Sequence, residues 1–336
     1  MNNPFFSIVI PVYNGLTHGL PKCLDSIWKQ PLDTSIYEVI CVDDCSTDGT
    51  RAWLHTQAAL RQNMRVLENE INIRQGGGRN KGFRVARGKY IVLIDQDDYY
   101  HPGAISKVYE HLRESDLDVL IVDCAYERPG KPSNKLQHNF PHREVMTGDE
   151  IILKNSIPYA PWKFIFLHSL IIDNNLFFDE NERIEDIDWV HRLVHSAKKV
   201  QYQPILFIHY LKGDTSTTMT SFKSPVTTYS SMRCGRRLYL LVTYDFVDSC
   251  DELKRAMENL GENVFRLSLR NLLTCKDSLK NKRKAICEII VPHSKRTTAL
   301  TKIAVAMPMA FCIVSNITAT FLPWFIILRR KWKYRN

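Results

Sequence analysis

A short apolar run that ends in a cluster of carboxylates constrains this chain more than any other feature. The run, Lys89-Tyr-Ile-Val-Leu-Ile-Asp-Gln-Asp-Asp-Tyr-Tyr100, is rich in β-branched residues before its first Asp, which is typical of a strand buried on both faces of a parallel sheet. It ends in Asp95, Asp97 and Asp98. Open α/β folds bind their ligands at the carboxyl edge of the sheet, and carboxylates gathered there suit Mg²⁺ or Mn²⁺. A solvated acidic turn is the alternative.

Strand-like and helix-like segments alternate along the first 125 residues. We expect strands at 6–13, 37–43, 64–68, 89–94 and 119–122, and helices at 20–29, after 50, at 75–87 and at 102–114. Such alternation with short spacing predicts an α/β fold, with a mostly parallel sheet flanked by helices on both faces.

Size and composition indicate a globular protein with more than one domain. The chain has 336 residues, of which 44% are apolar and 24% charged, values that exclude a disordered chain. Nine scattered cysteines without a Cys-x-x-Cys pair predict neither a disulfide framework nor a zinc site, and fit the reducing cytosol. Residues 5–12 form a strand-like run without a basic region or cleavage site, so we expect no signal peptide.

Four motifs occur in an order and spacing that resemble a known family. They are Ser7-Ile-Val-Ile-Pro-Val-Tyr-Asn14, Val42-Asp-Asp-Cys-Ser-Thr-Asp-Gly-Thr50, Arg79-Asn-Lys-Gly82 and Leu93-Ile-Asp-Gln-Asp-Asp98. Together they resemble the family 2 glycosyltransferases, closely over the first 125 residues and more loosely to about residue 218. The resemblance implies a GT-A (Rossmann-like) fold and an inverting, hexosyltransferase-type enzyme that uses a nucleotide sugar. It divides a catalytic domain at 1–220 into a nucleotide-sugar part, 1–125, and an acceptor part, 126–220. Residues 126–146 are polar and rich in Pro, His and Lys, and we expect them to form a loop over the acceptor side.

The donor site is expected at the ends of the first strands. Pro11, Val12 and Tyr13 end the first strand, where backbone groups can face a planar base and the tyrosine can pack on it. Asp44 can accept from a uracil N–H or a ribose hydroxyl, and by resemblance it is the uracil-binding position; a helix-cap carboxylate is its alternative. Arg79 supplies a cation within reach of the nucleotide, or else a salt bridge to the acidic cluster.

The resemblance also assigns the carboxylates and a downstream lysine. It makes Asp98 the direct metal ligand, while Asp95 and Asp97 contact the sugar or ribose or support the ligand. His209-Tyr-Leu-Lys-Gly-Asp-Thr-Ser-Thr217 resembles the end of the family's catalytic domain. Lys212 in this segment is expected to close over the diphosphate, with a solvated loop lysine as the alternative.

The expected catalytic base lies in an acidic segment before a helix. Glu185-Asp186 occupies the place of the family's Glu-Asp pair, in which the Asp takes the proton from the acceptor hydroxyl. By resemblance Asp186 is therefore the general base, and Glu185 orients or contacts the acceptor. The alternative is an acidic first turn that stabilises the following helix.

The last third of the chain carries much of the net charge of +9. We expect a helical region at 221–300 and a hydrophobic tail at 301–336, in which Ile303 to Leu328 contains no charged residue and both flanks are basic. This pattern favours an anionic membrane surface over nucleic acid, with the protein on the cytoplasmic face of the membrane. A buried helical pair is the alternative.

The sequence therefore predicts a glycosyltransferase that moves a sugar from a UDP-sugar, with Mn²⁺ or Mg²⁺, to a hydroxyl of a glycan or lipid-linked glycan in bacterial surface polysaccharide synthesis. Two other classes stay open. One is a metal-dependent nucleotidyl- or phosphotransferase that uses the same carboxylates. The other is a non-catalytic, membrane-associated protein that binds nucleotide sugars.

Overall fold

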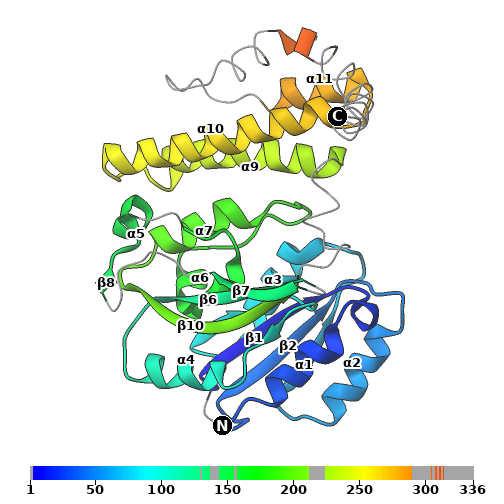
Figure 1. The fold of residues 1–336 in the computed structure, drawn as a ribbon, viewed down its shortest axis with the longest axis vertical. Coiled ribbons are helices and arrows are strands. Elements are labelled where there is room, and N and C mark those ends of the chain that lie inside the picture. The colour runs from blue at the N-terminus through cyan, green and yellow to red at the C-terminus, as the bar shows by residue number, and fades with distance from the viewer. Residues whose placement is uncertain are drawn as a thin grey trace, which may run out of the picture. The chain divides into compact units, whose positions relative to one another are not determined.

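The computed structural model describes most of the chain in two compact units. The described residues are 3–128, 131–136, 144–154, 157–211 and 224–289, with single positions at 304, 307, 308, 310, 311 and 313. One unit comprises Met1–Gly213 and the other Asp214–Asn336, whereas the sequence predicts the first boundary after residue 220. Figure 1 shows the ribbon.

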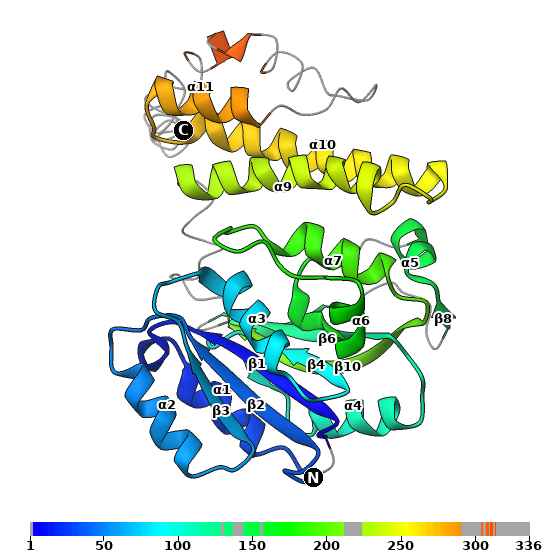
Figure 2. The ribbon, with the colours of Figure 1, turned by 180° about the vertical axis from the view of Figure 1, so that it is seen from behind.

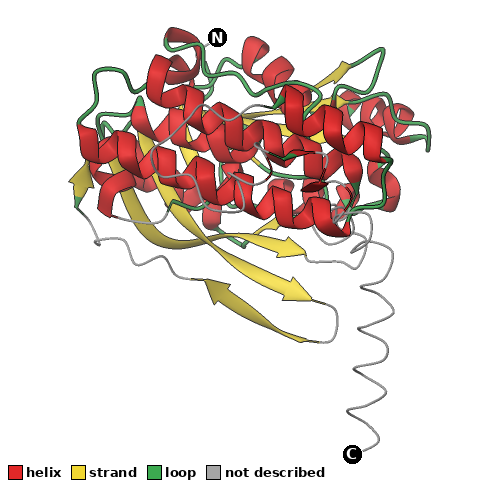
Figure 3. Cartoon of the chain, turned by 90° about the horizontal axis from the view of Figure 1, so that it is seen from above, coloured by secondary structure: helices red, strands yellow, loops and turns green. Residues whose placement is uncertain are grey.

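A ten-stranded mixed sheet forms the first unit. Its strands lie in the order β3-β2-β1-β4-β9-β6-β10-β5, with β7 added beside β6 and β8 beside β10. The strands are β1 (Phe6–Val12), β2 (Tyr37–Asp43), β3 (Met64–Glu68), β4 (Tyr90–Leu93), β5 (Tyr99–Tyr100), β6 (Val119–Arg128), β7 (Lys131–Leu136), β8 (Val145–Met146), β9 (Phe164–Leu167) and β10 (Val200–Leu211). β1, β2, β3, β4, β6 and β10 run in one direction and the others oppose them, and the curl of the long strands is visible in Figure 3.

Helices cover both faces of this sheet. They are η1 (Gly15–Thr17), α1 (Leu20–Trp28), α2 (Thr50–Ala59), α3 (Arg74–Val85), α4 (Ala104–Arg113), α5 (Gly148–Lys154), η2 (Pro161–Lys163), α6 (His168–Asp173) and α7 (Asp186–His195). Comparing Figures 1 and 2 shows α1 on one face and α3 on the other. The predicted α/β class with flanking helices is therefore confirmed.

The central strands are buried on both faces, as their composition predicts. Every residue of β1, β2 and β4 is buried. α3 packs closely on β1, since a Cβ built at Gly82 would lie 2.3 Å from Val9 Cγ1. A side chain at that position would push the helix away from the sheet, which explains the glycine in the Arg79–Gly82 motif.

The segment after residue 125 differs from the loop that its polar composition predicts. β6 continues to Arg128, and β7 pairs back on it antiparallel, with Cys124 opposite Leu136 and Arg128 opposite Lys131. Polar residues form strands where a neighbouring strand supplies the ladder partners, so composition alone misses them.

The second unit is helical, as the sequence predicts for 221–300. Its helices are α9 (Pro225–Tyr244), α10 (Asp251–Thr274) and α11 (Leu279–Glu288). α9 and α10 approach closely at two glycines, where a Cβ on Gly235 would lie 3.2 Å from the Gly261 carbonyl oxygen.

The start of the predicted hydrophobic tail belongs to this helical unit. The core of this unit contains Phe265 and Ile286 together with Ala304 and Phe311, which are 0% and 5% exposed. Within the described ranges, no helix combines the length and apolar character needed to cross a bilayer. Most of 303–328 lies outside the described residues, so the prediction for the tail stays a prediction.

Candidate functional site

The candidate site lies where β1, β2 and β4 end. β1 and β2 are paired up to Val12 and Asp43, and the Asp44 N–H donates to the Val12 carbonyl at 2.7 Å. Parallel pairing thus brings the predicted base-binding residues and Asp44 to one edge of the sheet. Pro11 and Val12 are buried, whereas the Tyr13 side chain is 45% exposed and available to a ligand.

A side-chain amide fixes the backbone of Tyr13. The Gln96 Oε1 accepts from the Tyr13 N–H and its Nε2 donates to the Tyr13 carbonyl, both at 2.9 Å. Gln96 lies between Asp95 and Asp97, so two hydrogen bonds link the carboxylate segment after β4 to the end of β1. No pattern in the sequence indicates this role for Gln96.

Asp44 is buried at the start of α3 and accepts three hydrogen bonds. Its Oδ1 accepts from Asn69 Nδ2 at 2.9 Å and from the Ile73 N–H at 2.8 Å, and its Oδ2 accepts from the Arg74 N–H at 2.8 Å. Asp44 therefore satisfies orphan N–H groups at the α3 N-terminus. This is the capping role that was its alternative, although for α3 rather than α2, where Asp48 accepts from the Thr50 N–H.

The Arg79 side chain is buried and forms ion pairs with two carboxylates. Its guanidinium donates from Nη2 to Asp95 Oδ1 at 2.8 Å and from Nη1 to Glu185 Oε1 at 3.0 Å, and its side chain is 3% exposed. Burial acts to lower its pKa, but the two carboxylates outweigh that effect and raise it. The structure thus gives Arg79 the salt bridge that was the alternative to nucleotide contact.

Asp98 is the most deeply buried carboxylate of the cluster. It is 1% exposed; its Oδ1 accepts from the Leu211 N–H at 2.9 Å, while its Oδ2 has no hydrogen-bond partner in the described part of the chain. Burial, then the charges of Asp97 and Asp95, raise the pKa of Asp98 well above its usual value. Burial and Asp95 likewise raise the pKa of Asp97 to about 6.

These carboxylates fit a divalent cation held mainly by other ligands. A buried, unpaired carboxylate oxygen is costly unless a cation or a donor meets it. Among the described residues, no group of three or more His, Cys, Asp or Glu side chains is arranged to enclose a metal. If such a cation binds, Asp98 Oδ2 would be one oxygen ligand, and water and phosphate would fill other positions, as Mg²⁺ sites commonly allow.

Asp186 begins α7, directly after Glu185. Burial is the largest influence on its pKa, and despite the opposing Arg79 guanidinium it raises the pKa of Asp186 to about 6. Burial also raises the pKa of Glu185, again against Arg79. Asp186 and Asp188 occupy the first turn of α7, so the helix-stabilising alternative and the proposed role as a base are compatible.

Glu185 also contacts the glycine-rich start of α3. A Cβ on Gly76 would lie 3.2 Å from Glu185 Cγ and 3.0 Å from the Asp179 carbonyl oxygen. Gly76 therefore lets α3 approach the acidic segment around Glu185. The carboxylates after β4 and the pair before α7 thus meet through α3, on which Arg79 lies.

Lys212 lies outside the described residues, so its role stays a prediction. Two histidines at the border of the site lie together: His101 Nδ1 is 2.9 Å from His209 Nε2, and His209 Nδ1 donates to Glu127 Oε1 at 2.7 Å. The two histidines are 108 positions apart, so no local spacing could have found them.

Comparisons with known proteins identify the family and relatives of this chain. Residues 7–174 match the family model described as "Glycosyl transferase family 2". The poly(ribitol-phosphate) beta-glucosyltransferase of Bacillus spizizenii is 29% identical over 67% of this chain, although the chain spans only 35% of that protein's length. The uncharacterized glycosyltransferase EpsJ of Bacillus subtilis is 25% identical over 85% of this chain and 83% of its own.

A solved structure shares the fold. The crystal structure of residues 1–349 of Staphylococcus aureus TarS in complex with UDP superposes with a TM-score of 0.68 at 19% identity. The superposition covers 96% of this chain and 92% of that one. It confirms the predicted GT-A architecture.

Proposed function

Because this chain belongs to glycosyl transferase family 2, we propose that it transfers a sugar from a UDP-sugar to a hydroxyl of a glycan or lipid-linked glycan. The observation that carries the proposal is the Arg79 bridge. One buried guanidinium joins Asp95, in the carboxylate segment after β4, to Glu185, beside the proposed base. Transfer between two bound substrates requires that the donor and acceptor regions lie close together, and here they meet at one residue.

In this proposal the donor nucleotide binds at the ends of β1 and β2. The exposed Tyr13 ring packs on the uracil, and Gln96 keeps the Tyr13 backbone in place. Asp44 accepts from the base or the ribose through lone pairs that its three N–H partners leave free. The UDP complex of a protein with the same fold supports the choice of nucleotide.

Asp98 would hold the metal ion, with Asp97 in support. The unpaired Oδ2 of Asp98 is the first ligand in this proposal. A bound Mn²⁺ or Mg²⁺ would neutralise charge on the departing diphosphate. Asp95, fixed by Arg79, remains available beside them for the sugar or the ribose.

Asp186 acts as the general base. With a pKa of about 6 it is ionised at neutral pH and still basic enough to accept a proton. It takes the proton from the acceptor hydroxyl, and the oxygen then forms a bond to the anomeric carbon while the bond from that carbon to the diphosphate breaks. Attack from the face opposite the diphosphate inverts the anomeric configuration.

The proposed acceptor is a polymer or lipid-linked glycan of the bacterial surface. One relative acts, by its name, on poly(ribitol-phosphate), so a polyol-phosphate chain is the first acceptor to test. We place the protein on the cytoplasmic face of the membrane through its C-terminal tail. Since Ala304 and Phe311 are buried in the helical unit, the proposed membrane contact concerns the apolar and basic residues 314–336.

Transfer with a doubly labelled donor tests this function. UDP-sugars carrying ¹⁴C in the sugar and ³²P in the β-phosphate are incubated with poly(ribitol-phosphate) or lipid-linked glycan in Mn²⁺. We expect ¹⁴C in the acceptor and ³²P in released UDP. Appearance of ³²P in the acceptor together with ¹⁴C would instead show transfer of the sugar phosphate with release of UMP. Appearance of both labels in free sugar 1-phosphate would show a nucleotidyltransferase, and UDP-sugar binding without any transfer would show a binding protein.

A further inference from the structure

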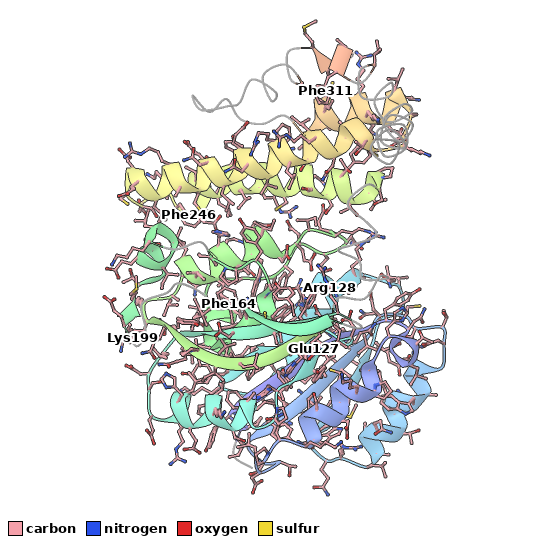
Figure 4. All side chains as sticks on the ribbon, viewed as in Figure 1. Glu127, Arg128, Phe164, Lys199, Phe246 and Phe311 are labelled. Atoms are coloured by element: carbon pink, nitrogen blue, oxygen red, sulfur yellow. The ribbon has the colours of Figure 1, made fainter. Side chains whose placement is uncertain are left out.

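A network of side chains joins strands β5, β6 and β10 beside the candidate site, and none of its members is a predicted site residue. Glu127, at the end of β6 (Figure 4), accepts from the Tyr99 hydroxyl at 2.8 Å through Oε2 and from His209 Nδ1 at 2.7 Å through Oε1. The rings of Tyr99 and His209 are stacked, with centroids 4.6 Å apart and planes at 1°. Lys22 Nζ lies 3.5 Å from the centroid of the Tyr99 ring.

Glu127 carries a negative charge in this network. Burial alone would raise its pKa, but the hydrogen bonds from Tyr99 and His209 more than offset burial and lower the pKa of Glu127. Charge-assisted hydrogen bonds are stronger than neutral ones. One carboxylate of β6 thus holds a side chain of β10 and a side chain of β5.

The backbone ladder that this network reinforces is very short. β5 consists of Tyr99 and Tyr100 and pairs with β10 only through Ile208↔Tyr100 and His209↔Tyr99. A two-residue ladder has little stability of its own. The stacked pair Tyr99–His209 is one of its two cross-strand pairs, so Glu127 fixes the position of β5 on β10 through the side chains of that pair.

The same two strands position the proposed metal ligand. Asp98 directly precedes Tyr99, and Leu211 follows His209 by two residues on the same strand. The Leu211 N–H holds Asp98 Oδ1 at 2.9 Å, which leaves Oδ2 as the oxygen without a partner in the described residues. The direction in which Asp98 presents that oxygen depends on how β5 lies against β10.

We propose that Glu127 is a positioning residue that sets the affinity of the Asp98 site for a divalent cation and the diphosphate of the donor. This inference rests on the proposed function. It acts through Tyr99 and His209, and Glu127 itself touches neither substrate nor metal. Groups that orient a ligand residue commonly change metal affinity by about tenfold or more when they are altered.

The test compares Glu127→Gln with the wild-type chain. Gln keeps the shape but loses the charge, and its amide offers one acceptor oxygen where the carboxylate has two. Mn²⁺ binding is measured from the loss of the free-ion signal in electron paramagnetic resonance, with and without UDP, and UDP binding by calorimetry. We expect Mn²⁺ and Mn²⁺-dependent UDP binding to weaken about tenfold, UDP binding without metal to stay the same, and kcat at saturating donor and Mn²⁺ to change less than about twofold.

Two further variants separate positioning from folding. Tyr99→Phe removes one hydrogen bond of Glu127 and keeps the stack on His209, so we expect a smaller loss of the same kind. Glu110→Gln is the matched control, because Glu110 on α4 is 61% exposed and pairs only with Arg113 among the described residues; its binding should equal that of the wild type. If Glu127→Gln does not fold, Tyr99→Phe decides the question.

The possible results distinguish failure of the role proposed for Glu127 from failure of the proposed function. Unchanged Mn²⁺–UDP affinity in Glu127→Gln and Tyr99→Phe overturns the inference and leaves the proposed function intact. A wild-type chain that binds UDP equally well without Mn²⁺ does the same. A wild-type chain that binds neither overturns both.

Discussion

Replacing Arg79 tests the arrangement of the site most severely. Its side chain is 3% exposed and its two partners, Asp95 and Glu185, are 16% and 6% exposed. Removing one partner of a buried ion pair costs about 3–5 kcal/mol, because an uncompensated charge remains. Since Asp95 retains some solvent, we expect Arg79→Met to lower the free energy of unfolding by about 3 kcal/mol.

Urea denaturation of metal-free protein at pH 9 and at pH 6 measures this cost. Burial raises the pKa of Glu185 to about 8 although Arg79 opposes it, and without Arg79 this pKa rises further. Above pH 8 the wild-type carboxyl ionises beside Arg79, whereas the variant must keep it protonated or bury an unpaired charge, so the deficit of the variant should be larger at pH 9 than at pH 6. Adding Glu185→Gln to Arg79→Met should recover about 1 kcal/mol or more, because an unpaired buried amide costs less than an unpaired charge.

Arg84→Met is the control for a generic loss of arginine. Arg84 lies on the same helix, is 53% exposed and is 3.8 Å from Glu180, so its cost should stay below about 1 kcal/mol. Equal losses of stability in Arg79→Met and Arg84→Met would contradict the cost assigned to the buried ion pairs. A further loss at pH 9 on adding Glu185→Gln to Arg79→Met would contradict the role of the unpaired charge.

Three further predictions follow from single residues. The kcat/KM profile should rise with pH through an apparent pKa of about 6, because Asp186 must be ionised to act; a profile that is flat from pH 5 to 8 contradicts this. In Asp98→Ala, calorimetry should show no Mn²⁺-dependent UDP binding, whereas metal-dependent binding as tight as in the wild type would remove Asp98 as the ligand. Gly82→Ala should lower the urea midpoint, because its Cβ would lie 2.3 Å from Val9 Cγ1 in a close-packed interior; an unchanged midpoint would show that α3 shifts freely.

The strands and the positions of the carboxylates were predictable, because short stretches of sequence indicate them. The runs before Asp44 and Asp95 combine β-branched residues with abrupt polar ends, and parallel pairing brings such ends together. The role of Arg79 was predictable only as a pair of alternatives. The observed ion pair depends in part on Glu185, 106 residues away, and no local spacing in the sequence indicates that contact.

Other parts of the site lay beyond the reach of sequence patterns. Gln96 looks like a spacer between two Asp residues, yet it pairs with the backbone of Tyr13. Glu127 lies in a polar stretch predicted as a loop, and its partners Tyr99 and His209 are 28 and 82 residues away. Such contacts arise from the order of strands in the sheet. Neither the strand propensity of single residues nor the spacing of apolar residues along the chain specifies that order.

One comparison tests the central claim most directly: UDP binding and acceptor-dependent UDP release, measured side by side for the wild type and Asp186→Asn. The account predicts that both proteins bind UDP in Mn²⁺ with similar affinity, and that only the wild type releases UDP when a UDP-sugar and a poly(ribitol-phosphate) acceptor are present. Acceptor-dependent release by Asp186→Asn at the wild-type rate would contradict the assignment of Asp186 as the base that activates the acceptor hydroxyl.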